Sequence, residues 1–171
     1  GAVLRVLPMT PEGDLDTARL GDVLGERTRI VCVSHTSNAL GSVSPLREII
    51  EAARAVGAAV LVDGAQATPH APVDVQALGA DFFVFSGHKT YGPMGIGVLW
   101  GRESWLERLP PYQGGGDMID TVTFEKTTYA GLPSKFEAGT PNVAGALGLA
   151  AAVDYLTTLG MENVAAHEAD L

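Results

Sequence analysis

Two stretches of the sequence decide the fold: residues 58–63 read AAVLVD, and residues 81–89 read DFFVFSGHK. Both contain a short apolar run, which is typical of a buried strand in a parallel sheet. Both then end in polar side chains, at Asp63 in the first stretch and at Lys89 in the second. Because ligands of open parallel sheets bind at the carboxyl ends of the strands, the two stretches predict a ligand site at one edge of a sheet.

The rest of the chain alternates between strands and helices. Further strands are expected at residues 2–7, 29–34 and 95–100, and helices at residues 45–56, 74–78 and 142–159. Ser44 is expected to cap the first of these helices, with Pro45 at its first position. Asp14 and Asp16 are expected to begin another helix. Strands that alternate with helices predict an α/β fold with a mostly parallel sheet, flanked by helices on both faces.

The composition limits the classes of function and partner. The 171 residues carry a net charge of −9, whereas nucleic acids and anionic membranes attract basic surfaces, so neither is expected as a partner. No apolar run approaches the ~18 residues of a membrane span, and no signal peptide is expected. Cys32 is the only cysteine, which excludes an internal disulfide and a cysteine-based metal cluster, and no metal site is expected. We expect a cytoplasmic protein in which Cys32 is buried in its strand and unreactive.

Lys89 is the strongest candidate for a catalytic residue in this sequence. It follows a buried strand and is flanked by Gly87 and Gly92, so it could lie in a confined pocket. Desolvation there would favour the neutral amine that attacks an aldehyde. By residue type alone, a surface lysine on a loop is the commoner case by roughly ten to one. Ser86 and His88 reverse this preference, because both could donate hydrogen bonds to a phosphate group.

Three polar residues near the same predicted edge could complete a cofactor site. Asp63 ends an apolar strand, where a carboxylate is costly unless it is paired, and a pyridinium nitrogen is a suitable partner. Alternatively, Asp63 caps the next turn, since Asp-Gly is a turn dipeptide. Gln66 could donate to a phenolate oxygen, and Asn38 could orient the same oxygen or the substrate. For Gln66 or Asn38 alone, a loop hydrogen bond is the commoner case.

Several motifs taken together resemble a known family. Residues 62–67 (VDGAQA) and 85–93 (FSGHKTYGP) resemble the class V, fold-type I pyridoxal-phosphate enzymes. Residues 35–41 (HTSNALG), 114–119 (GGGDMI) and 136–142 (FEAGTPN) resemble the group II cysteine desulfurases, the SufS-type and selenocysteine-lyase-like branch. The resemblance covers nearly the whole chain, in order.

The resemblance implies a pyridoxal 5'-phosphate site. Lys89 would form the Schiff base with the cofactor and later shuttle protons. Asp63 would pair with the pyridine nitrogen, and Gln66 with the phenolate oxygen. Asn38 would lie near that oxygen and the substrate carboxylate.

The resemblance also implies a shared site and a reaction. Ser86 and His88 would hold the phosphate, and Thr140 would reach the phosphate of the neighbouring subunit in a homodimer. The reaction would convert L-cysteine to L-alanine and leave a persulfide, whose sulfur would pass to an acceptor protein of an iron–sulfur cluster assembly system. His35 and His70 receive no role.

The resemblance leads us to expect that residues 1–171 form the C-terminal portion of the large cofactor-binding domain, without an N-terminal segment and a C-terminal small domain. The family's persulfide-forming cysteine would lie beyond Leu171, and Cys32 does not match its position. The isolated chain is therefore expected to be inactive. Two alternatives remain open: another class V enzyme, such as a selenocysteine lyase, a cysteine sulfoxide lyase, an aminotransferase or an epimerase, or a non-catalytic fragment.

Overall fold

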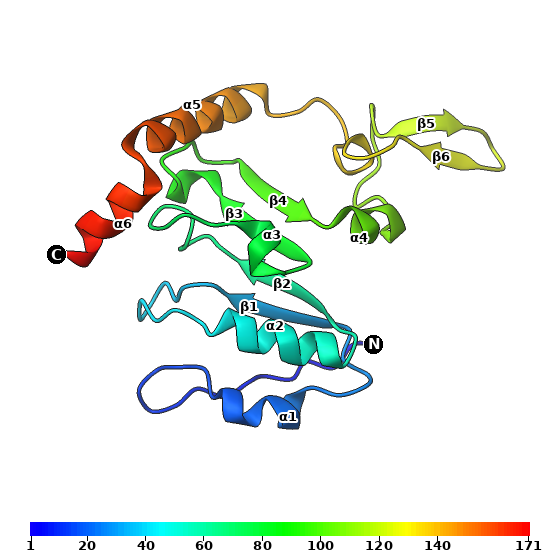
Figure 1. Ribbon diagram of the computed structural model, residues 1–171. Coiled ribbons are helices and arrows are strands. Elements are labelled where there is room, and N and C mark those ends of the chain that lie inside the picture. Colours follow the sequence, from blue (N-terminus) through cyan, green and yellow to red (C-terminus); the bar gives the residue numbers. More distant parts are fainter.

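The central feature of the fold is a four-stranded sheet in the strand order β1-β2-β3-β4. The computed structural model describes residues 1–171. The strands are β1 (Ile30–Ser34), β2 (Ala59–Asp63), β3 (Phe82–Ser86) and β4 (Gly97–Gly101). β1, β2 and β3 run parallel, whereas β4 is antiparallel to β3 (Figure 1). The predicted α/β fold with a mostly parallel sheet is confirmed.

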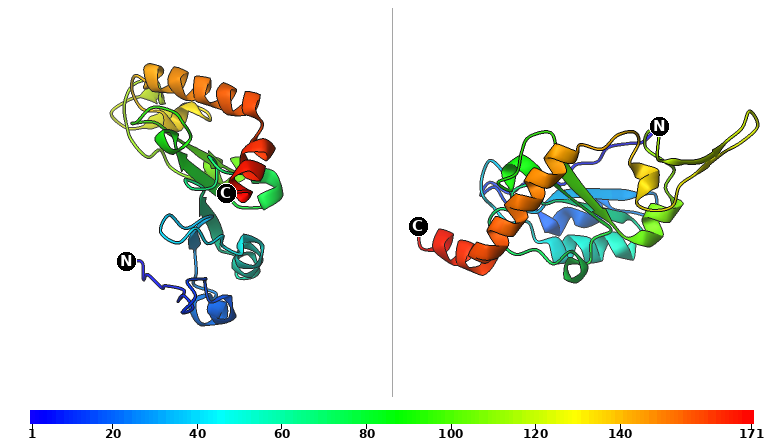
Figure 2. Two further views of the ribbon diagram at one scale, coloured as in Figure 1. Left: turned by 90° about the vertical axis from the view of Figure 1, so that its left-hand side faces the viewer. Right: turned by 90° about the horizontal axis from the view of Figure 1, so that it is seen from above.

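One face of the sheet carries the hydrophobic core. Three helices lie on this side, α1 (Leu20–Val23), α2 (Leu46–Ala55) and α3 (Val75–Leu78) (Figure 2, left). Leu46, Ile50 and Ala53 recur along α2 at helical spacing and pack against Val60 and Val62 of β2. This periodicity explains why the segment is helical, since it places these three apolar side chains on the face of α2 that meets the sheet.

The other face of the sheet is largely open, and the prediction of helices on both faces was wrong. Side chains alternate along a strand, so β1 directs Ile30 and Cys32 away from the core. Ile30 is 52% exposed, and Leu99 of β4 is 60% exposed, because no helix of this chain covers them. The prediction that Cys32 is buried was wrong for the same reason.

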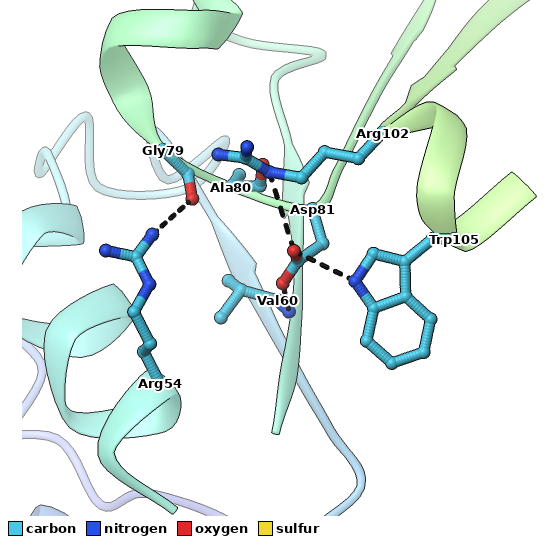
Figure 3. A network of polar contacts seen from close by, with 7 residues as sticks. All are labelled: Arg54, Val60, Gly79, Ala80, Asp81, Arg102 and Trp105. Atoms are coloured by element: carbon cyan, nitrogen blue, oxygen red, sulfur yellow. Dashed lines mark hydrogen bonds and ion pairs between the residues drawn. The ribbon is translucent and has the colours of Figure 1, made fainter. Parts of the chain in front are cut away.

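A polar network holds the amino end of β3 (Figure 3). The Asp81 carboxylate accepts hydrogen bonds from the Val60 amide at 2.9 Å and from the Trp105 indole at 3.0 Å. Arg102 lies 3.6 Å from the same carboxylate and donates to the Ala80 carbonyl at 2.9 Å. These contacts join the start of β3 to β2 and to the short helix α4 (Glu103–Arg108).

The C-terminal part of the chain contains a hairpin and two helices. The hairpin of β5 (Ile119–Val122) and β6 (Thr127–Tyr129) projects from the body, and α5 (Val143–Leu159) is followed by α6 (Met161–Ala169) (Figure 1). Short 3-10 turns occur at Thr17–Arg19, Gly87–Lys89 and Ser134–Phe136. No helix is by itself long and apolar enough to cross a membrane; α5 and α6 meet the length and composition only as a pair bent by 67°.

The helix starts test the capping predictions. The helix predicted at residues 142–159 begins at Val143, where Asn142 accepts from the Gly145 amide at 2.9 Å, and a short 3-10 helix follows Asp16 as predicted. The predicted cap at Ser44 was wrong, because its hydroxyl donates to the Ser34 carbonyl at 2.6 Å and the helix begins at Leu46. The strand predicted at residues 2–7 was also wrong, because no neighbouring strand pairs with this exposed segment.

Candidate functional site

The predicted site residues gather at the carboxyl edge of the parallel strands. Ser34 at the end of β1 is paired with Asp63 at the end of β2, and Asp63 is paired with Val84 of β3. The His35 amide extends this pairing by donating to the Asp63 carbonyl at 2.7 Å. Since all three strands run in the same direction, the loops that follow them leave the sheet on one side.

Asp63 begins the turn at residues 63–68, which we call the Asp63 turn. Its carboxylate is exposed rather than buried, and Oδ1 accepts from the Ala65 amide at 2.9 Å. This bond is the turn cap that the sequence offered as the alternative interpretation. The second oxygen, Oδ2, makes no hydrogen bond and remains available as an acceptor.

Gly64 explains how Asp63 can follow the core so closely. A Cβ atom at this position would lie 1.9 Å from Phe83 Cζ, inside the ring's own volume. Only glycine therefore lets the chain turn directly over the buried Phe83 ring. The Gly64 amide donates to the Val84 carbonyl at 2.8 Å, which fixes the start of the turn against β3.

Asn38 and Gln66, predicted to face the same cofactor oxygen, do lie together. The Gln66 side-chain amide donates to the Asn38 side-chain oxygen, although 28 residues separate them along the chain. The second N–H of the Gln66 amide makes no bond within the protein and can still donate. The loop after β1 and the Asp63 turn are thereby joined by one polar contact.

Lys89 lies in a tight turn at residues 86–92, which we call the Lys89 turn. The amides of Thr90 and Gly92 both donate to the Gly87 carbonyl at 2.9 Å, and the Gly87 amide donates to the Ile96 carbonyl at 2.8 Å. A Cβ on Gly87 would lie 2.8 Å from Ile96 Cγ2, so this wrapping of the chain requires glycine. The turn therefore presents Lys89 from a closely packed base.

Three polar side chains of the Lys89 turn have no partners within the protein. Ser86, His88 and Lys89 make no side-chain hydrogen bond or ion pair, and Ser86 and Lys89 are half-buried. Ser86 and His88 line a surface hollow whose other wall includes Ile96 and Leu99. Three donor side chains within residues 86–89, at the carboxyl end of β3, are thus free to bind an anionic or carbonyl group.

Helix α5 supports the Lys89 turn from behind. Its buried residues Gly145, Leu149, Ala152 and Leu156 form one stripe. Leu149 packs so closely on the turn that a Cβ on Gly92 would lie 3.0 Å from its Cδ1. This packing accounts for the buried stripe of α5, whereas its other apolar residues, among them Leu147 at 69% exposed, are not covered by this chain.

Thr140 is not brought into contact with the other predicted residues. It is exposed, precedes α5 and makes no side-chain hydrogen bond. Its neighbour Asn142 donates to the Gly95 carbonyl at 3.2 Å, which ties this loop to the segment after the Lys89 turn. The position leaves Thr140 free to contact another molecule.

The remaining histidines lie outside this group of side chains. Burial lowers the pKa of His35, whose Nδ1 is 3.1 Å from Thr36 Oγ1. His70 contacts Glu168 of α6 at 2.9 Å, on the far side of the Asp63 turn. Sequence reasoning missed a different feature, a contact between the hydroxyls of Thr68 and Thr90, because nothing in the sequence pairs two threonines 22 residues apart.

A comparison with protein families decides the relationship. The sequence profile of the aminotransferase class-V family matches residues 1–171, which is the whole chain. The chain belongs to the aminotransferase class-V family. A cysteine desulfurase of Dickeya dadantii (strain 3937) is 57% identical to this class-V chain over 169 residues, which are 98% of this chain and 41% of the relative. The structure of the cysteine desulfurase CsdA from Escherichia coli matches with a TM-score of 0.88 at 43% identity, covering 92% of this chain and 39% of that one.

A solved structure of a protein with a different activity is also similar. The structure of the cystine C–S lyase C-DES in complex with its reaction product cysteine persulfide matches with a TM-score of 0.75 at 34% identity, covering 86% of this chain and 40% of that one. This class-V chain spans about two fifths of the length of the curated relatives it matches. The comparisons confirm the predicted family and fold class, while the roles of the individual site residues stay predictions.

Proposed function

We propose that Lys89 holds pyridoxal phosphate and that the protein carrying this chain is a cysteine desulfurase of the SufS-type, group II branch. Such an enzyme converts L-cysteine to L-alanine, retains the sulfur as a persulfide and passes it to an acceptor protein of an iron–sulfur cluster assembly system. The observation that carries the proposal is the set of three unpartnered donors, at residues 86, 88 and 89, beside the edge where Asp63 ends β2. The 57% identity to a cysteine desulfurase supports the choice of reaction.

The donors and acceptors at this edge fit the functional groups of the cofactor. Ser86 and His88 offer donors for a phosphate, and Lys89 offers an amine for an aldehyde. Asp63 Oδ2, which has no partner, offers an acceptor for a protonated ring nitrogen. Bound there, pyridoxal phosphate would supply an electron sink for bonds at the substrate Cα atom.

The protein's own groups would then orient and hold protons. Asp63 would keep a proton on the ring nitrogen through Oδ2, while its Oδ1 stays fixed by the Ala65 amide. The free N–H of Gln66 would donate to the phenolate oxygen, and Asn38 would hold the Gln66 amide in place. Lys89 Nζ would be the group able to carry protons at the substrate Cα atom.

A lysine replacement tests the attachment site. In the full-length protein, Lys89→Ala is expected to abolish the absorbance of lysine-bound pyridoxal phosphate and the turnover of L-cysteine. Borohydride reduction followed by peptide mass spectrometry should place the cofactor on Lys89 in the unmodified protein. Lys126→Ala is the matched control, because this exposed hairpin lysine makes no side-chain contact. A cofactor found on another lysine would contradict the proposal. No cofactor in the unmodified protein would also contradict it and would favour a non-catalytic fragment.

A cysteine replacement tests where the persulfide forms. Cys32 lies in the middle of β1, paired with Leu61, and not among the loops at the site edge. We therefore expect Cys32→Ser in the full-length protein to retain turnover, and the isolated 171-residue chain to release no sulfide from L-cysteine. Loss of sulfide release in Cys32→Ser, or release by the isolated chain at enzyme rates, would show that Cys32 is the nucleophile.

Thr140 tests the proposed homodimer. If Thr140 completes the phosphate site of the partner subunit, Lys89→Ala and Thr140→Ala subunits should complement each other. A mixed dimer would contain one site with both native residues, so activity should reappear after subunit exchange. Activity that stays absent after verified exchange would place Thr140 outside the partner's site.

The second candidate is a cystine C–S lyase, favoured by the similarity to C-DES. The products separate the two reactions, because a desulfurase yields alanine whereas β-elimination yields pyruvate and ammonia. Alanine from L-cysteine is expected. Pyruvate from cystine, with no alanine from L-cysteine, would favour the lyase. L-selenocysteine turned over in preference to L-cysteine would favour a selenocysteine lyase.

A further inference from the structure

Thr90, the residue after Lys89, is the one buried polar side chain in the protein. It is only 4% exposed, and its hydroxyl lies 3.0 Å from the hydroxyl of Thr68. A buried hydroxyl without a partner would be costly, and the contact with Thr68 is the shorter of the two contacts that can satisfy the Thr90 hydroxyl.

The contact joins the two turns that carry the predicted cofactor residues. Thr68 ends the Asp63 turn, two residues after Gln66, and Thr90 directly follows Lys89. No other side-chain hydrogen bond connects the two turns. The backbone hydrogen bond from the Gly64 amide to the Val84 carbonyl lies closer to the sheet, where β2 and β3 still pair.

The hydroxyl protons extend the bridge into the backbone of both turns. Thr68 Oγ1 also lies 3.3 Å from the Gly64 carbonyl, and Thr90 Oγ1 lies 3.4 Å from the Ser86 carbonyl. Two hydroxyl protons can satisfy the bridge and one of these carbonyls at a time. In the arrangement with the shorter contacts, the Thr90 hydroxyl donates to the Thr68 hydroxyl, which donates to the Gly64 carbonyl. This series of hydrogen bonds ends at the residue next to Asp63.

We propose that Thr68 and Thr90 are positioning residues that fix the distance between Lys89 and the Asp63–Gln66 pair. The inference rests on the proposed function, because it concerns a cofactor held at one end by Lys89 and at the other by Asp63. A rigid planar ring can satisfy both ends only if the two turns keep their spacing. The hydroxyl bridge supplies this constraint where the strand pairing has ended.

Valine and serine replacements separate the hydroxyl from the packing. Thr90→Val and Thr68→Val keep the side-chain shape but remove the bridge, whereas Thr90→Ser keeps the hydroxyl and loses a methyl group. In the full-length protein, each valine variant is expected to bind pyridoxal phosphate about 5-fold more weakly, the equivalent of one net hydrogen bond of about 1 kcal/mol. Thr90→Ser should bind nearly as well as the unmodified protein.

Two further readouts distinguish positioning from a general loss of stability. Hydrogen exchange of the apo-protein should become faster at the amides of Thr90 and Gly92 in both valine variants, with the amides of α2 unchanged. The pH dependence of the lysine-bound cofactor's absorbance should shift in the valine variants and return in Thr90→Ser. Thr68→Val/Thr90→Val should bind no more weakly than the weaker single variant, because both lose the same bridge.

The outcomes also separate this inference from the proposed function. If the unmodified protein places no cofactor on Lys89, the proposed function fails. If the cofactor is on Lys89 but the valine variants match the unmodified protein in affinity and exchange, the bridge does not position the site. Losses in Thr90→Ser as large as those in Thr90→Val, or strictly additive losses in the double variant, would likewise overturn the inference.

Discussion

Gly64→Ala is the substitution for which the structure gives the most definite expectation. The added Cβ would lie 1.9 Å from Phe83 Cζ and 2.5 Å from Cε1, whereas ordinary van der Waals contact begins at 3.4 Å. The ring would have to retreat by roughly 1.5 Å, yet Phe83 is only 2% exposed and is packed against Val62 and Ile50. Overpacking of this kind costs about 1–3 kcal/mol, and a value of about 2 kcal/mol lowers the folding equilibrium constant roughly 30-fold.

The assay is urea denaturation of the full-length apo-protein, with pyridoxal phosphate affinity as a second readout because Asp63 precedes the altered residue. Gly25→Ala is the control, since its Cβ meets nothing within 4 Å. Gly64→Ala/Phe83→Leu should recover part of the loss, because leucine lacks the far edge of the ring. Stability of Gly64→Ala equal to that of Gly25→Ala, or losses in the double variant that simply add, would refute the reasoning.

Two further predictions concern regions away from the cofactor turns. Asp81→Ala should destabilise the protein by about 1–3 kcal/mol, because it leaves the Val60 amide and the Trp105 indole without their acceptor, and urea denaturation against the exposed control Asp154→Ala measures this. Unchanged stability in Asp81→Ala would show that the network contributes nothing. Burial lowers the pKa of His35 in the folded protein below the ordinary histidine pKa of about 6.5. The neutral imidazole therefore contributes to stability above pH ~6.5, and this contribution is lost as the pH falls through the pKa of the folded protein. His35→Gln should therefore flatten the acid side of the stability profile, and an imidazole that titrates at or above its ordinary pKa by NMR would contradict this.

The strands could be predicted because each is a short apolar run that ends in polar or glycine residues. The apolar runs predict strands at residues 58–63 and 81–85, and β2 (Ala59–Asp63) and β3 (Phe82–Ser86) begin and end within one residue of these bounds. The order of strand ends along the chain also placed Asn38 and Gln66 at one edge of the sheet, where their side chains form a hydrogen bond. Local pattern alone was sufficient for both, since parallel strands deliver their following loops to one edge.

Other features depended on contacts that a local pattern does not contain. The mostly apolar run of residues 2–7 is compatible with a strand, but a strand needs a neighbour, and none pairs with this segment. The hairpin of β5 and β6 turns through Thr123, whose hydroxyl accepts from the amides of Glu125 and Lys126, and no Asn-Gly or Asp-Gly turn marks it. The Thr68–Thr90 bridge depends on the register between two loops, which only the folded chain defines.

The Asp81 network has a consequence for how this protein can change over evolution. β3 is secured at its amino end by Asp81, and its carboxyl end, a strand's length away, carries Ser86 and the Lys89 turn. Under the proposed function, substitutions that alter substrate preference would act at the carboxyl end of this strand, whereas the Asp81 network stabilises its amino end. Under the same proposal, selection for new activity at the Lys89 turn should enrich compensating changes around Trp105 and Arg102, which contact Asp81 at the other end of the strand.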